Sequence, residues 1–287
     1  MKLGASMELL PRPPPIRIPQ HADRQREENV MAAKFAQLFD RGEDMVSAMK
    51  RVAQCSHLRQ LNEEERDLLY RAYDDQIASR LRQWRTICRI QRNEALEGGD
   101  EVHVAAAAEL RAKIESEMRD ICQSFLGLVD GHVLRKARAG EAQIFWWRAK
   151  ADFQRHLAEF DSSSDEYESL AQCSLERAHE LALEHLRPSS RQSLQLIVDL
   201  YLFYEDAIGC HDKAFALARE SVDLIADDIQ QDLSRGLPML EDSERQNLIR
   251  FLQLQLATEE HDGDSDEVIH LKKNVAIGVS HGKLPDA

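Results

Sequence analysis

The amino-acid sequence predicts an all-α fold of about nine antiparallel helices. Glycine and proline are scarce, with 12 and 8 residues among 287, whereas residues that favour helices are abundant. Hydrophobic residues make up 43% of the chain, which is enough to bury a core at this length. Helix caps and breaks recur with short connections between them, so successive helices should pack antiparallel. A helical-repeat array is the competing architecture, but the expected helices differ too much in length for a steady repeat period.

The two ends of the chain lack the periodicity of the middle. Residues 1–22 are rich in proline, which predicts a disordered arm of polyproline character. Residues 259–287 begin with acidic residues and carry no helical pattern, which predicts a mostly disordered tail. We therefore expect one helical domain over residues 23–258.

The first three helices are separated by recognisable breaks. A turn at residues 40–42 divides a helix around residues 30–39 from one around residues 45–53. Asn62 and Glu65 then have the spacing of a capping box, in which the Asn side chain accepts from a first-turn amide and the Glu side chain reaches back to the cap. This box predicts the start of a long third helix, which ends before a pair of glycines.

The middle of the chain predicts three further helices. Asp100 is placed to cap a fourth helix, also long, that stops at Asp130 and Gly131. After a basic loop, apolar periodicity predicts a fifth helix over residues 144–160 and a sixth over residues 166–186.

Three more helices complete the expected fold. Pro188 and the serines after it separate the sixth helix from a seventh, which Gly209 ends. Asp212 is expected to cap an eighth helix, and Asp242 a ninth.

Charge and composition exclude several classes of protein. The formal net charge is -14, from 51 acidic and 37 basic residues, so general attraction to nucleic acid has no electrostatic basis. No apolar run reaches the length of a membrane span. The five cysteines are widely spaced and favour buried thiols in a reducing compartment. We predict a soluble, cytoplasmic protein that binds neither nucleic acid nor a membrane.

Signatures of catalysis and of metal binding are missing from the sequence. There is no Gly-rich phosphate loop, no Gly-x-Ser-x-Gly elbow and no His-Glu-x-x-His motif. The nearest approach to a metal site is His179 and His185 with two glutamates between them, but these histidines would face different sides of a helix. We predict no enzyme, no cofactor and no metal.

Short stretches along the chain resemble the 14-3-3 family in the order in which that family has them. They span roughly residues 27–256, and the match is poor in the ninth helix. The matching stretches are residues 64–69, 72–73 and 84–85 in the third expected helix, 113–115 and 119–122 in the fourth, 155–159 in the fifth, and 203–204 with 213–214 in the seventh and eighth.

This resemblance implies a dimeric regulatory adaptor in which each protomer has a concave groove for a phosphoserine or phosphothreonine segment of a client protein. A phosphate carries close to two negative charges, so its site needs cations with fork geometry and a hydroxyl donor. The family supplies one Lys and one Arg from the third helix and an adjacent Arg-Tyr pair from the fifth.

Most of these positions differ in this chain. The Lys position falls on Asp74 and the Arg position on Leu81, whereas the fifth-helix Arg is kept as Arg155 and the Tyr becomes His156. An Asn that holds the client backbone becomes Asp199. Losing two charged hydrogen bonds should weaken phosphopeptide binding by roughly a hundredfold to ten-thousandfold. The resemblance therefore implies a degenerate, weakened phosphate pocket.

Two other arginines are candidates to compensate for the lost cations. Arg71 lies one turn before Asp74, and Arg85 lies one turn after Leu81. The alternative is that both arginines pair with nearby carboxylates such as Asp74. His156 has the same two interpretations, as a phosphate ligand or as a neutral hydrogen-bonding residue. A second family Asn, on the ninth helix, becomes Gln255 or Leu256 depending on the register.

The charge pairs that the family uses across its dimer interface have counterparts here. Arg41 would pair with Glu117, and Asp44 with Lys113. All four interface residues keep the sign of charge that the family has, whereas most pocket positions do not. This difference favours a working dimer interface, in a homodimer or in a heterodimer with another 14-3-3 chain. Two functions therefore stay open: an adaptor for client proteins with a weakened phosphate pocket, or a phosphate-independent scaffold or heterodimerisation partner of an intact paralogue.

Overall fold

A computed structural model describes residues 20–55, 59–97, 100–138, 140–161, 165–235 and 243–259. Over these ranges the secondary structure is helical and contains no strand, which confirms the all-α prediction. The helices are α1 (Gln20–Leu38), α2 (Gly42–Gln54), α3 (Glu63–Glu97), α4 (Glu101–Leu128), α5 (Glu141–Phe160), α6 (Asp165–His185), α7 (Arg191–Leu202), α8 (His211–Ser234) and α9 (Ser243–Glu259), with short turns η2 (Val129–Val133), η3 (Leu134–Lys136) and η4 (Phe203–Ile208). Nearly all of the predicted arm and tail lies outside the described ranges.

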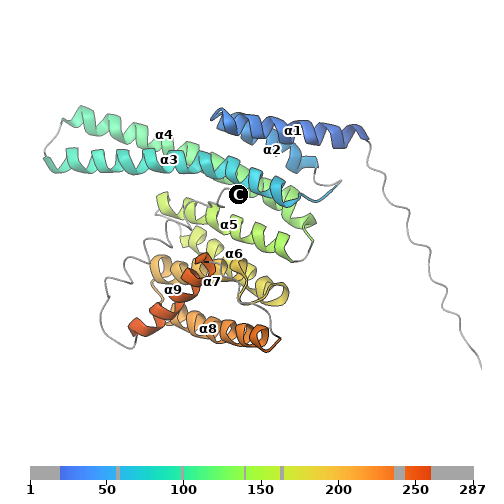
Figure 1. Cartoon of the computed structure of the whole chain (residues 1–287). Helices are drawn as coiled ribbons and strands as arrows, with labels where there is room; N and C mark the ends of the chain where they lie inside the picture. Colours follow the sequence, from blue (N-terminus) through green and yellow to red (C-terminus); the bar gives the residue numbers. More distant parts are fainter. Residues whose placement is uncertain are drawn as a thin grey trace, which may run out of the picture.

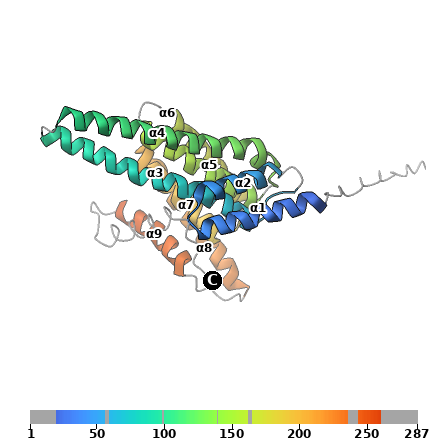
Figure 2. The same cartoon turned by 90° about the horizontal axis from the view of Figure 1, so that it is seen from above.

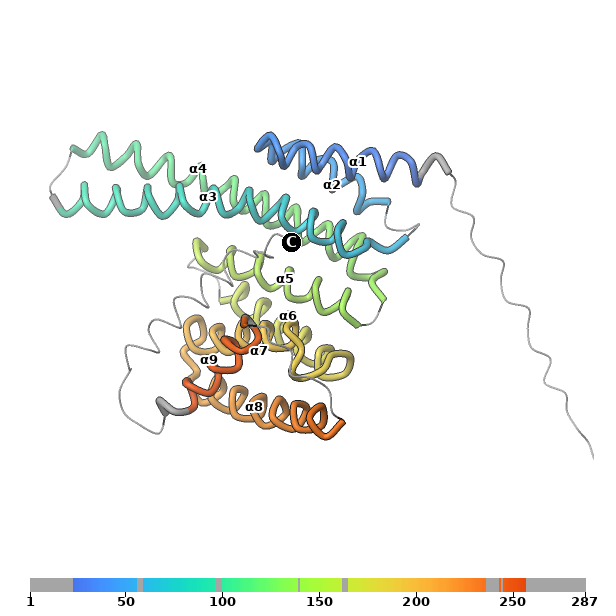
Figure 3. Tube along the Cα trace, in the orientation of Figure 1, coloured from blue at the N-terminus to red at the C-terminus, as the bar shows by residue number. Residues whose placement is uncertain are grey.

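Helices that follow each other in the chain pack side by side, as short connections require. The long helices α3 and α4 run together, and one end of this pair extends beyond the rest of the molecule (Figures 1 and 2). Helices α1 and α2 lie against the other end, and α5 to α9 follow below (Figure 3). Helix α5 is thus the layer between the first four helices and the last four.

The buried hydrophobic residues form two cores, and α5 contributes to both of them. In the first core, the rings of Phe125 on α4 and Phe153 on α5 stack with centroids 3.9 Å apart, and Tyr73 on α3 meets Phe125 edge-on at 5.3 Å. In the second core, Tyr201 on α7 meets Phe251 on α9 edge-on at 5.7 Å. Ring contacts therefore fix α3, α5, α7 and α9 relative to their neighbours.

The predicted caps of the two long helices are confirmed. The Glu65 amide donates to Asn62 Oδ1 at 2.9 Å, and the Asn62 amide donates to Glu65 Oε2 at 2.8 Å, which completes the capping box. The amide of Val102 donates to Asp100 Oδ1 at 2.9 Å, so Asp100 is the cap of α4.

One predicted helix end is confirmed and one predicted cap is wrong. Helix α4 ends at Leu128, next to the predicted stop at Asp130 and Gly131, and the chain continues there as the π turn η2. Buried valines on this turn and a bond from Lys150 Nζ to Asp130 Oδ1, at 2.9 Å, hold it in place. Asp212 does not cap α8, since the cap position is Cys210, which follows the left-handed Gly209 and bonds back to η4. The predicted cap Asp242 lies outside the described ranges.

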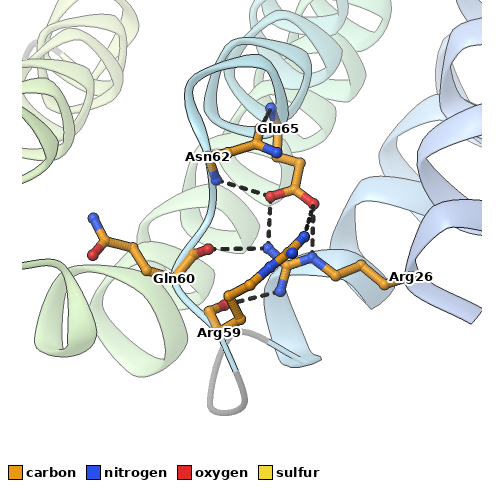
Figure 4. A network of polar contacts seen from close by, with 5 residues as sticks. All are labelled: Arg26, Arg59, Gln60, Asn62 and Glu65. Carbon is orange, nitrogen blue, oxygen red and sulfur yellow. Dashed lines mark hydrogen bonds and ion pairs between the residues drawn. The ribbon is translucent and has the colours of Figure 1, made fainter. Parts of the chain in front are cut away.

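A buried ion pair attaches α1 to the start of α3 (Figure 4). Arg26 donates from Nε and Nη2 to the carboxylate of Glu65 at 2.7 and 2.6 Å, and both side chains are 4% exposed. The same guanidinium donates to the carbonyl oxygens of Arg59 and Gln60 at 2.8 and 3.2 Å. This fork satisfies the buried charge and closes the segment between α2 and α3 onto α1.

Candidate functional site

The positions aligned with the family's phosphate pocket lie where α3, α5 and α7 face one another. Tyr70 on α3 donates from its hydroxyl to Asp152 Oδ2 on α5 at 3.1 Å. Arg148, one turn before Asp152 on the same helix, donates from Nε to Asp199 Oδ2 on α7 at 2.5 Å. We call this set the central network: its bonded members are Tyr70, Arg148, Asp152 and Asp199, and Asp74 and Arg155 belong to it through their electrostatic interaction with Asp152.

Asp74, which the sequence comparison is expected to align with the family's Lys, lies on α3. It follows Tyr70 by one helical turn, so the two side chains share a face, and Tyr70 contacts Asp152. Asp74 is half-buried. Burial, followed by the negative charges of Asp152 and Asp75, raises the pKa of Asp74 to about 7. A phosphate at this place would meet a carboxyl group instead of an ammonium.

Leu81, at the family's Arg position, belongs to the first hydrophobic core. Its side chain is 5% exposed and lies in the cluster that includes Ile77 and Trp84. The exchange of Arg for Leu therefore removes a cation and adds apolar packing in the same step.

On α5, Arg155 is the residue expected to be kept from the family pattern, and His156 is the one expected to replace a Tyr. The guanidinium of Arg155 lies over the ring of Phe203 at 6.0 Å, a cation–π contact to the end of α7. Burial, and then the positive charges of Arg155 and Arg85, lower the pKa of His156 to about 4. His156 is therefore neutral at pH 7, which favours the interpretation as a neutral residue over that as a charged phosphate ligand.

The two arginines considered as replacements lie in different places. Arg85 reaches the neighbourhood of His156 but donates from Nε and Nη2 to Glu159 Oε1 at 2.9 and 2.7 Å. Arg71 lines a surface hollow between α1 and the first turns of α3, together with Lys34 and Asp67. The pairing alternative thus describes Arg85, with Glu159 as its partner, and it also fits Arg71, whose positive charge acts on the carboxyl groups of Asp67 and Asp75.

Asp199 and Gln255, two residues expected to align with the family's client-binding Asn positions, are buried in this chain. Asp199 is 2% exposed and also accepts from Gln195 Nε2 at 3.2 Å. Gln255 is 2% exposed and accepts the Tyr201 hydroxyl at 3.1 Å, and Leu256 packs against the second core. In either register, the ninth-helix position therefore serves packing between α7 and α9.

Sequence reasoning missed Arg148, which makes the shortest contact of the central network. Its charge acts on Asp199 and Asp152 together: burial would lower the pKa of Arg148, but these two carboxylates outweigh it and raise that pKa. A signal was present, because Arg148, Asp152 and Arg155 recur at the spacing that places side chains on one face of a helix.

The four expected interface charges lie on α2 and α4. Arg41 forms an ion pair with Asp44 inside the chain, and Glu117 accepts from Arg80 Nε at 3.4 Å. Lys113 is exposed on α4. Large apolar side chains are exposed at the end of α1 and in the turn that follows it, with Leu38 at 77% and Phe39 at 73%, and further ones lie on α3 and α4.

In the part of the chain that the structure describes, no group of three or more His, Cys, Asp or Glu side chains is arranged to hold a metal ion. Within the same part, no helix combines the length and apolar character needed to cross a membrane.

Comparisons with known proteins agree with the fold and the residue pattern. The model of the 14-3-3 protein family matches residues 32–252. The 14-3-3-like protein GF14-C of Oryza sativa subsp. japonica is 36% identical over 200 residues, covering 69% of this chain and 78% of that protein. The 14-3-3-like protein GF14 nu of Arabidopsis thaliana is 36% identical over 201 residues, covering 69% and 75%. A 14-3-3-like protein of Chlamydomonas reinhardtii is 36% identical over 200 residues, covering 69% and 77%.

The chain belongs to the 14-3-3 family, which confirms the resemblance drawn from the sequence. Membership supports a regulatory adaptor role in client binding, and it supports dimer formation.

Proposed function

We propose that this chain is a 14-3-3 adaptor whose client groove binds phosphate weakly. The observation that carries the proposal is the pairing of cations around Arg155. Arg148 is held by Asp199 and Arg85 by Glu159, while Asp74 stands at the family's Lys position. Arg155 remains as the family cation at this site.

Phosphate binding at the site has two unfavourable contributions. A phosphate would have to draw Arg148 away from Asp199, and the carboxylate left behind is 2% exposed, so it would be buried without its partner. It would also approach Asp74 and Asp152, whose charges already raise the pKa of Asp74. Each charged hydrogen bond not formed removes about 1.5–3 kcal/mol from binding.

The test is a calorimetric titration with a phosphoserine peptide of the Arg-x-x-pSer-x-Pro kind and with its unphosphorylated twin. Wild-type protein should bind the phosphopeptide with no better than weak affinity at pH 7.5. Asp74→Lys should improve that affinity roughly tenfold to hundredfold, because it adds a charged donor and removes a repelling group. Asp75→Lys is the matched control, since it makes the same charge change on the exposed neighbouring side chain. Tight, phosphate-dependent binding by the wild type would contradict the weak pocket.

The exposed apolar side chains on α1 favour a second function, in which the chain acts as a dimerisation partner or phosphate-independent scaffold. Met31, Phe35 and Leu38 fall on one stripe of the helix and are 47%, 54% and 77% exposed. Burial of such a stripe supplies association energy, while Arg41, Asp44, Lys113 and Glu117 exchange partners across the interface to set the register.

Sedimentation equilibrium tests this second function. Phe35→Glu should shift the assembly to monomers, because a charge would be placed in the apolar stripe. Leu183→Glu is the control, as Leu183 is 52% exposed on α6. A dimer that tolerates Phe35→Glu would count against α1 as the interface. Client capture that is insensitive to phosphatase and to Arg155→Ala would favour the scaffold over the weak phosphate reader.

A further inference from the structure

We infer that a basic surface beside the connection between α4 and α5 binds a short acidic segment of a partner protein. The surface consists of Arg59, Arg135, Lys136 and Arg138, and we call it the basic cluster. It lies at the end of the molecule opposite to the projecting end of the α3–α4 pair (Figure 1). It shares no residue with the central network, so the inference does not depend on how strongly the groove binds phosphate.

Two connections between helices meet at the basic cluster. Arg26 holds the segment before α3 through the carbonyl oxygens of Arg59 and Gln60, at 2.8 and 3.2 Å. The Gln60 side chain points away from Arg26 (Figure 4), and its Oε1 accepts from the Arg138 amide at 3.3 Å. The segments before α3 and before α5 are therefore adjacent, and each contributes cations to the same surface.

The segment that carries the other three cations has a backbone held by hydrogen bonds. The amide of Ala137 donates back to the turn η3 at 3.2 Å, and its carbonyl oxygen accepts from Gln143 Nε2 on α5 at 3.1 Å. Ala137 is buried, whereas Arg135, Lys136 and Arg138 on either side of it are exposed. A fixed backbone thus presents three cations to solvent.

The cations of the basic cluster are largely available to a partner. Within the described ranges, the three cations after η2 form no ion pair. Arg59 is 54% exposed, and its Nη2 lies 3.9 Å from Glu65 Oε1. Both oxygens of that carboxylate already accept from Arg26, at 2.7 and 2.6 Å, so Glu65 neutralises Arg59 only in part.

Four further acidic side chains flank the basic cluster along the chain, and two of them have cationic partners elsewhere. These pairs are Asp130 with Lys150 and Glu64 with Lys34. Glu63 and Glu141 are exposed, each in the first turn of its helix. Four cations against these two carboxylates leave a surface of net positive charge.

The charge of the whole chain decides which kind of acidic partner fits. A membrane surface or a nucleic acid carries negative charge over an area much wider than the basic cluster, and the chain has a net charge of -14. The Debye length is about 8 Å at physiological salt, so such a partner would also be repelled by acidic side chains around the cluster. A short segment rich in Asp and Glu contacts the cluster alone, and its carboxylates match the fork of an arginine.

The test is fluorescence anisotropy of the full chain with a labelled octapeptide of alternating Asp and Glu residues. The variant changes Arg135, Lys136 and Arg138 together to Gln. Each exposed ion pair changes affinity about 1.4-fold to fivefold, so the triple variant should bind the octapeptide roughly threefold to hundredfold more weakly. Lys136→Glu, a single change that adds repulsion, should weaken binding roughly twofold to twentyfold. Added salt should weaken wild-type binding as well.

The matched control changes Arg82, Arg89 and Arg92 together to Gln. These arginines are exposed on α3, so the net charge of the chain changes by the same amount at another place. The control should keep the octapeptide affinity within about twofold. Arg138→Lys, which preserves the charge of the basic cluster, should also keep most of the affinity. Circular dichroism melting checks that each variant is folded.

Arg155→Ala separates the basic cluster from the groove, because it should leave the octapeptide affinity unchanged. Loss of binding in Arg155→Ala, or an equal loss in the α3 control, would overturn the assignment. No detectable binding by the wild type at low salt would overturn it too. The same holds for a cluster-dependent preference for phosphatidylserine vesicles or for a single-stranded oligonucleotide over the octapeptide.

Discussion

Replacing Arg26 by Met should be among the most destabilising single changes in the first half of the fold. The substitution removes four hydrogen bonds of 2.6–3.2 Å and leaves the Glu65 carboxylate, which is 4% exposed, with only the longer contact to Arg59 at 3.9 Å as a cationic partner. Removing one partner of a buried ion pair costs about 3–5 kcal/mol. The bond that Glu65 accepts from the Asn62 amide stays in place, so we expect the lower half of this range.

Urea unfolding followed by circular dichroism measures this cost, with Arg24→Met as the matched control. Arg24 forms an ion pair with Glu28 on the same helix, but the two side chains are 82% and 64% exposed, so its loss should change the free energy of unfolding by no more than about 0.5 kcal/mol. Adding Glu65→Gln to Arg26→Met should restore part of the stability, because the buried charge is removed.

The pH dependence of stability gives an independent check on the contribution of the Arg26–Glu65 ion pair. Burial is the largest influence on Glu65 and opposes its ionisation, but the hydrogen bond from Arg26, the bond from the Asn62 amide and the charges of Arg26 and Arg59 together outweigh it and lower the pKa of Glu65 below its usual value. The pair therefore stabilises the fold at neutral pH, and this contribution is lost as the pH falls through the lowered pKa. The difference in free energy of unfolding between wild type and Arg26→Met should become smaller toward acid pH. Equal stability of the Arg26 and Arg24 variants at pH 7 would refute the reasoning.

Three further predictions concern stability. Asp40→Gly should stabilise the protein by about 0.5–1 kcal/mol in urea unfolding, because Asp40 ends α1 with a positive φ of 53°; destabilisation would show that its side chain has another role. Asp100→Ala should cost about 0.5–2 kcal/mol through loss of the α4 cap, and an unchanged unfolding midpoint would contradict this. Asp74→Asn should stabilise the fold by up to about 4 kcal/mol at pH 8 and by less than about 1 kcal/mol at pH 4, since a pKa raised from 3.8 to about 7 makes the folded state lose stability as the pH rises through that range; an equal effect at both pH values would rule out the titration.

Features set by neighbouring residues could be predicted from the sequence. The caps at Asn62 and Asp100 depend on atoms within three residues of each other, so spacing alone identifies them. The end of α4 near Asp130 was predicted, but the π turn η2 after it was not, because tertiary packing holds that turn in place. Contacts between residues far apart in the sequence could not be predicted, because they too depend on tertiary packing. Arg148 and Asp199 are 51 residues apart, and their pairing depends on how α5 and α7 are oriented.

The candidate site likewise combines features that the sequence could predict with features that it could not. Family comparison identified Asp74, Leu81 and Asp199 as departures from the pattern, because residue identity at an aligned position is a property of sequence. It could not show that Leu81 is a core residue or that Asp199 is occupied by Arg148. These facts depend on burial and on side-chain direction, which only the packed helices determine.

The place of α5 in both cores has a consequence for dissecting this protein. A fragment that ended before α5 would lose Phe153, and with it the stacked face of Phe125 and the edge contact to Tyr73. A fragment that began after α5 would lose Ile144 and Ala151, which belong to the second cluster. Neither half carries a complete interior, so limited proteolysis within this helix should release no stably folded piece, and the two ends of the chain should melt in one cooperative transition.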